Sequence, residues 1–306
     1  LYNNNLDKIN NNPFKFYKKY IQIKLNILDF KNFKLLKEKY FKIINLLQLE
    51  SEFYNENIRF IKASDIFNTI GLSYITDVTI KSKKLGLIPN YKLICLVHIK
   101  FQNKAINNFY INKISKYIDF IYDDNLIKNY KKYEELFDIH QNEFYNFENK
   151  LYLYTQSTGI LVNKIWFKKN KKPLFNLTDN EIKMGWETLN KLGIKSHDWF
   201  VCVHVRDQSF KGKEKFRDAN IKNYFSAFKE VTNIGGWVIR IGNNNIKKLP
   251  ILDKVIDYPF SKIKSDFMDI FLATQCKFMI GTSSGMSAIS HIANVPIAMT
   301  NYRPLS

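Results

Sequence analysis

Cysteine is scarce in this sequence, and its spacing excludes the common metal and redox motifs. The 306 residues include only Cys95, Cys202 and Cys276. They lie far apart, form no Cys-x-x-Cys, and share no spacing with histidine that suits zinc. Because they fall mostly in apolar stretches, we expect buried, reduced thiols in a cytoplasmic protein.

Long apolar runs and a leader pattern are also missing. No apolar run approaches the roughly 18 residues that a transmembrane helix needs. The first residues, LYNNN, show no signal-peptide pattern. We therefore expect a cytoplasmic protein, with peripheral attachment to the inner face of the cytoplasmic membrane left open. The chain starts without methionine and stops just after Pro304, a pattern consistent with a fragment.

Acidic residues are few compared with basic ones. Lys and Arg number 47 against 28 Asp and Glu, a formal charge of +19. Such an excess is compatible with nucleic acid, an anionic membrane surface or anionic substrates. It is more typical here of an AT-biased genome, because Lys, Asn, Ile, Phe and Tyr are abundant together. The lysines are scattered, with the densest run at 164–172, so we expect no specific nucleic-acid partner.

The apolar pattern divides the chain into three parts. Apolar residues make up 45% of the sequence, enough for real cores, and the length predicts two domains. Helical spacing over 14–50 predicts a helical hairpin, whereas 58–122 has an α/β pattern and 123–172 gives no clear assignment. We expect a helical extension at 1–57, an N-terminal domain at 58–172 and a C-terminal domain at 173–306.

The C-terminal pattern predicts a parallel sheet with covered faces. Thr178 and Glu181 fit a capping box at the start of a helix that Gly193 ends. Strands are expected at 200–205, 237–241, 255–256, 277–280 and 295–299, and helices at 220–232, 265–274 and 286–293. Ligands of such sheets bind at the carboxyl ends of the strands, where three polar clusters fall.

His204 and Arg206 form the first cluster. Side chains alternate along a strand, so these two share a face, and an arginine leaving a buried strand can fork onto phosphate oxygens. The alternative is a local ion pair of Arg206 with Asp207 or Asp218. His204 alone is more often a core histidine than a ligand.

The second and third clusters follow later strands. Arg240 precedes Gly242, and an arginine there is costly unless it is paired, ligand-facing or exposed. The loop GTSSG at 281–285 precedes a helix, whose free N–H groups and dipole favour an anion. It lacks the lysine of a Walker A loop, which excludes a P-loop ATPase. The alternative to an anion site is a simple Ser or Thr N-cap of the following helix. Asp269 either braces this loop or lies on a solvated face.

No acidic pair has the spacing of metal ligands. Asp123 and Asp124 are adjacent, lie outside the C-terminal domain and are typical of a turn. We therefore expect no metal, and charge stabilisation by arginine and a helix dipole.

Together and in this order, the clusters resemble a family of bacterial glycosyltransferases whose usual context is surface-carbohydrate synthesis. The resemblance covers roughly 173–306, more loosely 58–122, and is carried by VCVHVRD (201–207), FRDANI (216–221), GGWVIRIG (235–242), IDY (256–258), SDFMDIFL (265–272) and GTSSG (281–285). It implies a GT-B fold, two facing Rossmann-like domains with the donor in the C-terminal one. The His-x-Arg is also similar to that of α1,6- and protein O-fucosyltransferases.

The resemblance implies roles for individual residues. Arg206 would contact the donor diphosphate beside His204, and Glu214 stands where the α1,6-fucosyltransferases have an acid. The only small molecule required would be a nucleotide-diphosphate sugar, with no metal or other cofactor. The donor pocket would further include Arg217, Arg240, Gly242, Asp269, Gly281, Thr282, Ser283, Ser284 and Gly285.

The N-terminal domain departs from the family pattern of Gly-His followed by a glutamate. This chain has Gly71-Leu72, with Asp77 near the place of the acid. A base with a pKa raised by burial would suit acceptor activation, and Glu214 and Asp77 are the candidates.

These observations predict transfer of a glycosyl group, hexosyl or deoxyhexosyl, from a nucleotide-diphosphate sugar to a hydroxyl of a glycan, lipid-linked or protein acceptor. Two other classes remain open, a non-catalytic anion- or RNA-binding protein and an inactive scaffold that docks through its N-terminal helices. Since a GT-B enzyme usually continues beyond the equivalent of residue 306, we expect a truncated C-terminal domain.

Overall fold

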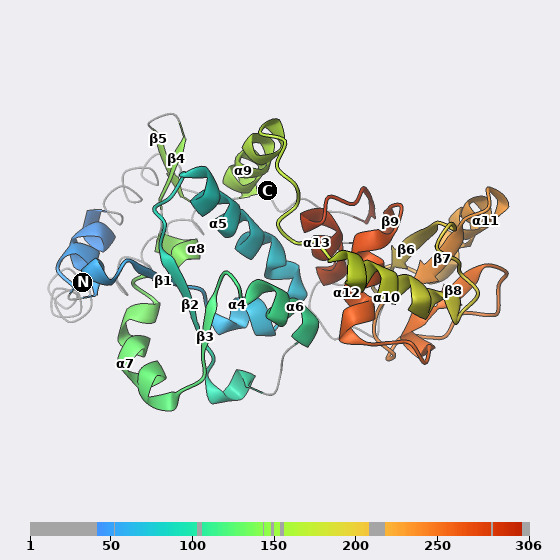
Figure 1. Ribbon diagram of the computed structural model, residues 1–306, viewed down its shortest axis with the longest axis horizontal. Helices are drawn as coiled ribbons and strands as arrows, with labels where there is room; N and C mark the ends of the chain where they lie inside the picture. The colour runs from blue at the N-terminus through green and yellow to red at the C-terminus, as the bar shows by residue number, and fades with distance from the viewer. Residues whose placement is uncertain are drawn as a thin grey trace, which may run out of the picture.

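The computed structural model describes residues 42–51, 53–102, 106–142, 144–147, 150–153, 156–207, 218–282 and 284–301. Within them the chain forms two parallel sheets, each with its own helices, and a small antiparallel hairpin (Figure 1). Most of the helical hairpin predicted for 14–50 lies outside the described residues, although 42–49 is helical.

The N-terminal domain is built on a three-stranded parallel sheet in the order β1-β2-β3. Helices cross between successive strands, as parallel pairing requires. Further helices and the β4-β5 hairpin follow the sheet. The elements are β1 Ile58–Phe60, α4 Ala63–Phe67, η3 Ile70–Leu72, α5 Ser73–Leu85, β2 Lys92–Leu96, η4 Ile99–Phe101, α6 Asn108–Ile114, β3 Asp119–Ile121, α7 Asp124–Glu134, α8 Ile139–Asn142, β4 Phe144–Phe147, β5 Lys150–Leu153 and α9 Gln156–Lys168.

Residues just before β1 belong to the packing of this domain. Phe53 stacks on Phe60 of β1 with ring centroids 5.6 Å apart and packs edge-on against Phe137. Gln48 donates a hydrogen bond of 2.8 Å to the carbonyl of Leu136. Burial of such aromatic side chains stabilises the fold, so this short stretch is part of the N-terminal core.

The C-terminal domain is built on a five-stranded parallel sheet in the order β10-β9-β6-β7-β8. The capping box is confirmed, because Thr178 and Glu181 exchange both hydrogen bonds. The elements are α10 Asp179–Asn190, β6 Phe200–His204, η6 Ile221–Tyr224, α11 Phe225–Asn233, β7 Trp237–Arg240, β8 Val255–Asp257, η7 Tyr258–Phe260, α12 Asp266–Gln275, β9 Met279–Thr282, α13 Gly285–Ile292 and β10 Ile297–Thr300.

Some predicted boundaries were wrong. β9 begins two residues later than predicted and runs through Thr282, because Gly281 pairs with His204 of β6 in the ladder. Gly281 and Thr282 of the predicted loop therefore belong to β9, and Gly285 begins α13. The helix predicted at 220–232 begins with the 3-10 turn η6.

The two domains touch through closely approaching backbone. A Cβ added to Gly285 would lie 2.9 Å from Ile70 and 3.1 Å from the amide nitrogen of Gly71. Asp266 accepts hydrogen bonds from the backbone and side-chain nitrogens of Asn108, at 2.7 and 3.0 Å. Figure 1 shows α6 and α5 of one domain beside α12 and α13 of the other.

The predicted fold class is confirmed. The chain is α/β, and two parallel-sheet domains face each other as in a GT-B fold. The N-terminal sheet is smaller than a full Rossmann sheet within the described residues. Among those residues, no helix combines the length and the apolar character needed to cross a bilayer.

Candidate functional site

A cavity of about 330 Å³ lies between the two domains. It opens where β6 and β7 end at their carboxyl edge, the position at which open parallel sheets bind ligands. Its volume falls within the range of small-molecule sites. It is lined by Asn68, Thr69, Ile70, Ile106, Asn107, His204, Arg206, Ile241, Gly242, Asn243, Asp269, Ser284, Gly285 and Met286.

Arg206 follows the end of β6 and lines this cavity while being buried. Its backbone N–H donates to the Thr282 hydroxyl at 2.9 Å, which fixes the chain as it leaves the strand. Its Nε donates to Asp218 Oδ1 at 3.0 Å. The ion pair of Arg206 with Asp218, one of the alternatives from the sequence, therefore exists. It holds the guanidinium in place, and Arg206 lines the cavity as well.

His204 is the last residue of β6 and lines the same cavity. Burial lowers the pKa of its imidazole to about 4, against a smaller opposing effect of Asp207. The ring is therefore neutral at pH 7 and can accept a hydrogen bond, whereas burial disfavours its protonation. Gly242 lies across from it with φ of 145°, a conformation that side chains rarely adopt.

The N-terminal end of α13 lines the cavity through Ser284, Gly285 and Met286. Ser284 is its N-cap, but its hydroxyl makes no capping bond. This Oγ is buried and has no hydrogen-bond partner within the described part of the chain. A helix N-terminus carries a partial positive charge, so this end of the cavity suits an anion.

Asp269 of α12 is the one aspartate or glutamate among the described lining residues. Lys264 Nζ lies 2.7 Å from its Oδ1. This lysine neutralises the carboxylate locally, and both side chains are partly exposed. Its contribution to the cavity is therefore polar without a large net negative charge.

Three predicted donor residues make structural contacts, and their role in donor binding stays a prediction. Arg240 is buried and its Nε donates to Asp257 at 2.8 Å, outside the described cavity lining. A Cβ on Gly281 would lie 2.1 Å from the His204 carbonyl oxygen, so glycine is needed there for strand packing. Thr282 caps the Arg206 amide.

The two residues predicted for the acceptor side, Gly71 and Asp77, both lie outside the described lining of this cavity. Gly71 packs its backbone against Gly285 and is absent from the described lining. Asp77 lines a different cavity of about 20 Å³. It is 5% exposed and pairs with Lys81 Nζ at 2.6 Å. Burial raises the pKa of Asp77 to about 6, although Lys81 works against this rise.

Three predicted residues, Glu214, Arg217 and Ser283, lie outside the described residues. Conversely, the sequence interpretation missed four polar residues that line the cavity, Asn68, Thr69, Asn107 and Asn243. The position of Asn68 and Thr69 just before Gly71, and of Asn243 just after Gly242, is the signal that could have identified them.

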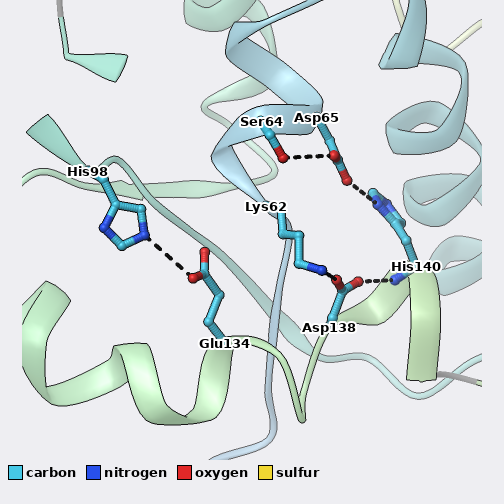
Figure 2. Close-up of polar contacts among 7 residues, drawn as sticks. All are labelled: Lys62, Ser64, Asp65, His98, Glu134, Asp138 and His140. Carbon is cyan, nitrogen blue, oxygen red and sulfur yellow. Dashed lines mark hydrogen bonds and ion pairs between the residues drawn. The ribbon is translucent and has the colours of Figure 1, made fainter. Parts of the chain in front are cut away.

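A second polar cluster in the N-terminal domain also escaped the sequence interpretation (Figure 2). Buried Asp138 pairs with Lys62 at 2.8 Å and accepts from the His140 amide at 2.9 Å. The His140 ring lies 3.2 Å from Asp65, whose pKa is lowered by this histidine despite opposing burial. These contacts tie the start of α4 to the start of α8, apart from the described cavity lining.

Metal-ligating groups do not gather in the part of the chain that the structure describes. No three His, Cys, Asp or Glu side chains come together there in a way that could hold an ion. The cavity instead presents Arg206, a neutral histidine and a helix N-terminus to whatever it binds.

Comparison with known proteins gives structural neighbours but no family assignment. No family model and no curated protein matches the chain. Among solved structures, E. coli ADP-heptose LPS heptosyltransferase II is similar with a TM-score of 0.41 and 8% identity over 76% of this chain and 81% of that one. E. coli heptosyltransferase WaaC with ADP-2-deoxy-2-fluoro heptose has a TM-score of 0.37 and 11% identity, over 81% and 90%.

A third neighbour is the dodecameric iron-containing heptosyltransferase TibC in complex with ADP-D-beta-D-heptose. Its TM-score is 0.36 at 12% identity, over 79% of this chain and 57% of that one. None of the three identities exceeds 12%, so an assignment of function depends on the geometry of the site. The similarity to fucosyltransferases stays a prediction.

Proposed function

We propose that the protein is a glycosyltransferase that moves a sugar from a nucleotide-diphosphate donor to a hydroxyl acceptor. The observation that carries this proposal is the cavity between the domains, where Arg206 and the N-terminus of α13 meet. A cleft between two parallel-sheet domains allows donor and acceptor to bind side by side. Its polar lining, with asparagines and a threonine, suits sugar hydroxyls.

Negative charge develops on the leaving diphosphate as the glycosidic bond to it breaks. A guanidinium and a row of helix N–H groups, fixed before the reaction, stabilise that charge without reorganisation. Arg206 is held by Asp218, and the unused Ser284 hydroxyl supplies a further donor. Ser283 and Arg217, which lie outside the described residues, belong to the same proposed donor site.

The acceptor hydroxyl must lose a proton as it attacks the sugar. His204 is the candidate within the described lining to contact that hydroxyl: burial lowers its pKa to about 4, so the neutral ring can accept a hydrogen bond from it, although so low a pKa makes the ring a weak base. Glu214 is the second candidate and lies outside the described residues. Asp77 is not assigned this role, because it lies in the smaller cavity and is paired with Lys81.

The biological setting proposed is the synthesis of bacterial surface polysaccharide or another glycoconjugate. The donor carries a hexosyl or deoxyhexosyl group, and the acceptor is a glycan, a lipid-linked sugar or a protein. This setting follows from the sequence resemblance, and reaction at the inner face of the cytoplasmic membrane fits it.

A thermal-shift screen of nucleotides tests the proposal directly. A sugar diphosphate at about 100 times its Kd should stabilise the fold by about 2.7 kcal/mol through mass action. A scaffold or an RNA-binding protein should show no such selective shift. If no nucleotide sugar raises the melting temperature, while RNA does, the enzyme proposal fails.

Turnover should persist in EDTA. Arg206 and the α13 N-terminus supply the positive charge that a divalent ion supplies elsewhere. The measurement is sugar transfer before and after chelation, with magnesium or manganese added back. Activity that disappears with EDTA and returns with metal would contradict this account of charge stabilisation.

A further inference from the structure

The orientation of α9 in the fold is fixed by its contacts with α5. A Cβ on Gly159 would lie 2.6 Å from the Tyr74 hydroxyl, so the two helices approach closely there. Asn163 Oδ1 accepts a hydrogen bond of 2.8 Å from buried Lys81. Val162 and Trp166 complete the buried side. One side of α9 is therefore committed to the domain core.

The opposite side of α9 is open to solvent and carries large apolar side chains. Ile160 is 65% exposed, Leu161 40% and Phe167 44%. Lys164 and Lys168 are exposed between them. Spacing of three, four and seven places these five residues on one helical surface, which we call the α9 face.

The charged residues in the sequence segment that contains α9 have one sign. No acidic residue occurs between Glu148 and Asp179, whereas Lys164, Lys168, Lys169, Lys171 and Lys172 all fall in that interval. All five lysines are exposed. Lys164 and Lys168 belong to the α9 face, and Lys169, Lys171 and Lys172 follow directly after the helix ends. In Figure 1, α9 lies at the rim of the molecule, outside α5.

We propose that the α9 face docks the protein on an anionic lipid surface. Apolar side chains with flanking lysines are the composition of helices that lie in a membrane interface. Each lysine near such a surface contributes attraction to acidic headgroups. Single-stranded nucleic acid would instead call for aromatic rings on which bases stack, and this face offers aliphatic Ile160 and Leu161 beside one phenylalanine.

Vesicle sedimentation tests the proposal with the whole chain. The protein should bind vesicles that contain phosphatidylglycerol, bind phosphatidylcholine vesicles poorly, and dissociate as salt rises. The double variant Lys164→Gln/Lys168→Gln should bind about 25-fold more weakly, at about fivefold per lysine. The variant Ile160→Ser/Phe167→Ser should lose about tenfold or more, because it removes exposed apolar area.

The matched control lies on α11 and its flanks, far from α9 (Figure 1). Ile234 is 72% exposed, and Lys222 and Lys229 are exposed too, so Lys222→Gln/Lys229→Gln and Ile234→Ser remove the same chemistry elsewhere. These controls should bind vesicles as the wild type does. Circular dichroism and melting curves should show that all variants stay folded, since every changed side chain is exposed.

Three results would overturn the proposal. The first is absence of binding to phosphatidylglycerol vesicles, and the second is an equal loss in the α11 controls. The third is evidence that something else occupies the α9 face. This would be oligonucleotide binding, or self-association in sedimentation velocity, that the α9 variants abolish while vesicles do not bind. Calorimetric donor affinity should be unchanged in every α9 variant, so failure here is distinct from failure of the proposed enzymatic function.

Discussion

Replacement of Arg206 by lysine is expected to reduce turnover about 10- to 1000-fold, the range seen when one preorganised charge-stabilising donor is lost. Lysine keeps the charge but presents a single ammonium, which cannot hold two diphosphate oxygens as the planar guanidinium does. Arg206→Ala should reduce turnover further. Both variants should weaken binding of a nucleotide diphosphate more than binding of the nucleoside, as measured by calorimetry.

Stability has to be separated from chemistry in this experiment. Arg206 holds Asp218 at 3.0 Å, so Arg206→Ala leaves a nearly buried carboxylate without that partner and should lower the melting temperature. Arg206→Lys is the cleaner variant, because a charge remains in place. Melting curves of each variant therefore accompany the binding measurement.

Arg240 provides a matched control on the neighbouring strand. It too is a buried arginine at a strand end, paired with an aspartate at 2.8 Å, but it is absent from the described cavity lining. Arg240→Lys should cost stability while leaving donor affinity unchanged. A stably folded Arg206→Ala protein with wild-type donor affinity would remove Arg206 from the site and with it the main support for the proposed function.

The elements that the sequence predicted well are those with local signals. The capping box of Thr178 and Glu181 is satisfied within four residues, and the apolar run of β6 reflects burial on both faces of the sheet. Such signals do not depend on the rest of the chain. The sequence therefore predicted the C-terminal domain almost element by element.

Several predicted residues line the cavity, some at strand ends and some at helix starts: His204, Arg206, Gly242, Asp269, Ser284 and Gly285. His204 and Arg206 leave β6 at its carboxyl end, and both line the cavity. Arg240 leaves β7 in the same way, but Asp257 of β8 holds its side chain. Neither that pairing, nor the clash that requires glycine at 281, is visible locally, because both depend on sheet register.

The N-terminal contribution to the site could not be predicted for a related reason. Asn68, Thr69 and Asn107 reach the cavity only because η3 and α6 dock on α13 and α12. Domain docking depends on long-range shape, in particular the contact of Gly71 with Gly285. The cluster of Asp138 and His140 arose in a stretch whose apolar pattern gave no element assignment.

Asp77 and Lys81 form a buried ion pair whose disruption should have the largest effect on stability. Both residues are at most 5% exposed, and Lys81 Nζ contacts Asp77 at 2.6 Å and Asn163 at 2.8 Å. Lys81→Met removes the cation and leaves the buried carboxylate alone. We expect a loss of about 3–5 kcal/mol in the free energy of unfolding at neutral pH, measured by urea denaturation.

The pH dependence of the wild type follows from the pKa of about 6 that burial gives Asp77. This value lies above the ordinary pKa of 3.8. Between pH 3.8 and about 6, Asp77 therefore keeps its proton in the folded state but has released it in the unfolded state. The associated stability is present below about pH 4 and lost as pH rises through about 6, a decline of about 3 kcal/mol. Without Lys81 the pKa should rise further, so the deficit of Lys81→Met should widen above pH 6.

The double variant Asp77→Asn/Lys81→Met distinguishes a buried pair from a catalytic carboxylate. With no charge left to bury, it should regain most of the lost stability and lose the pH dependence between about 4 and 6. Since Asp77 lies in the smaller cavity, donor binding and turnover should also stay near wild type. Recovered stability with abolished turnover would show that Asp77 is the acceptor base after all, and a Lys81→Met protein as stable as wild type would show that the pair is not buried.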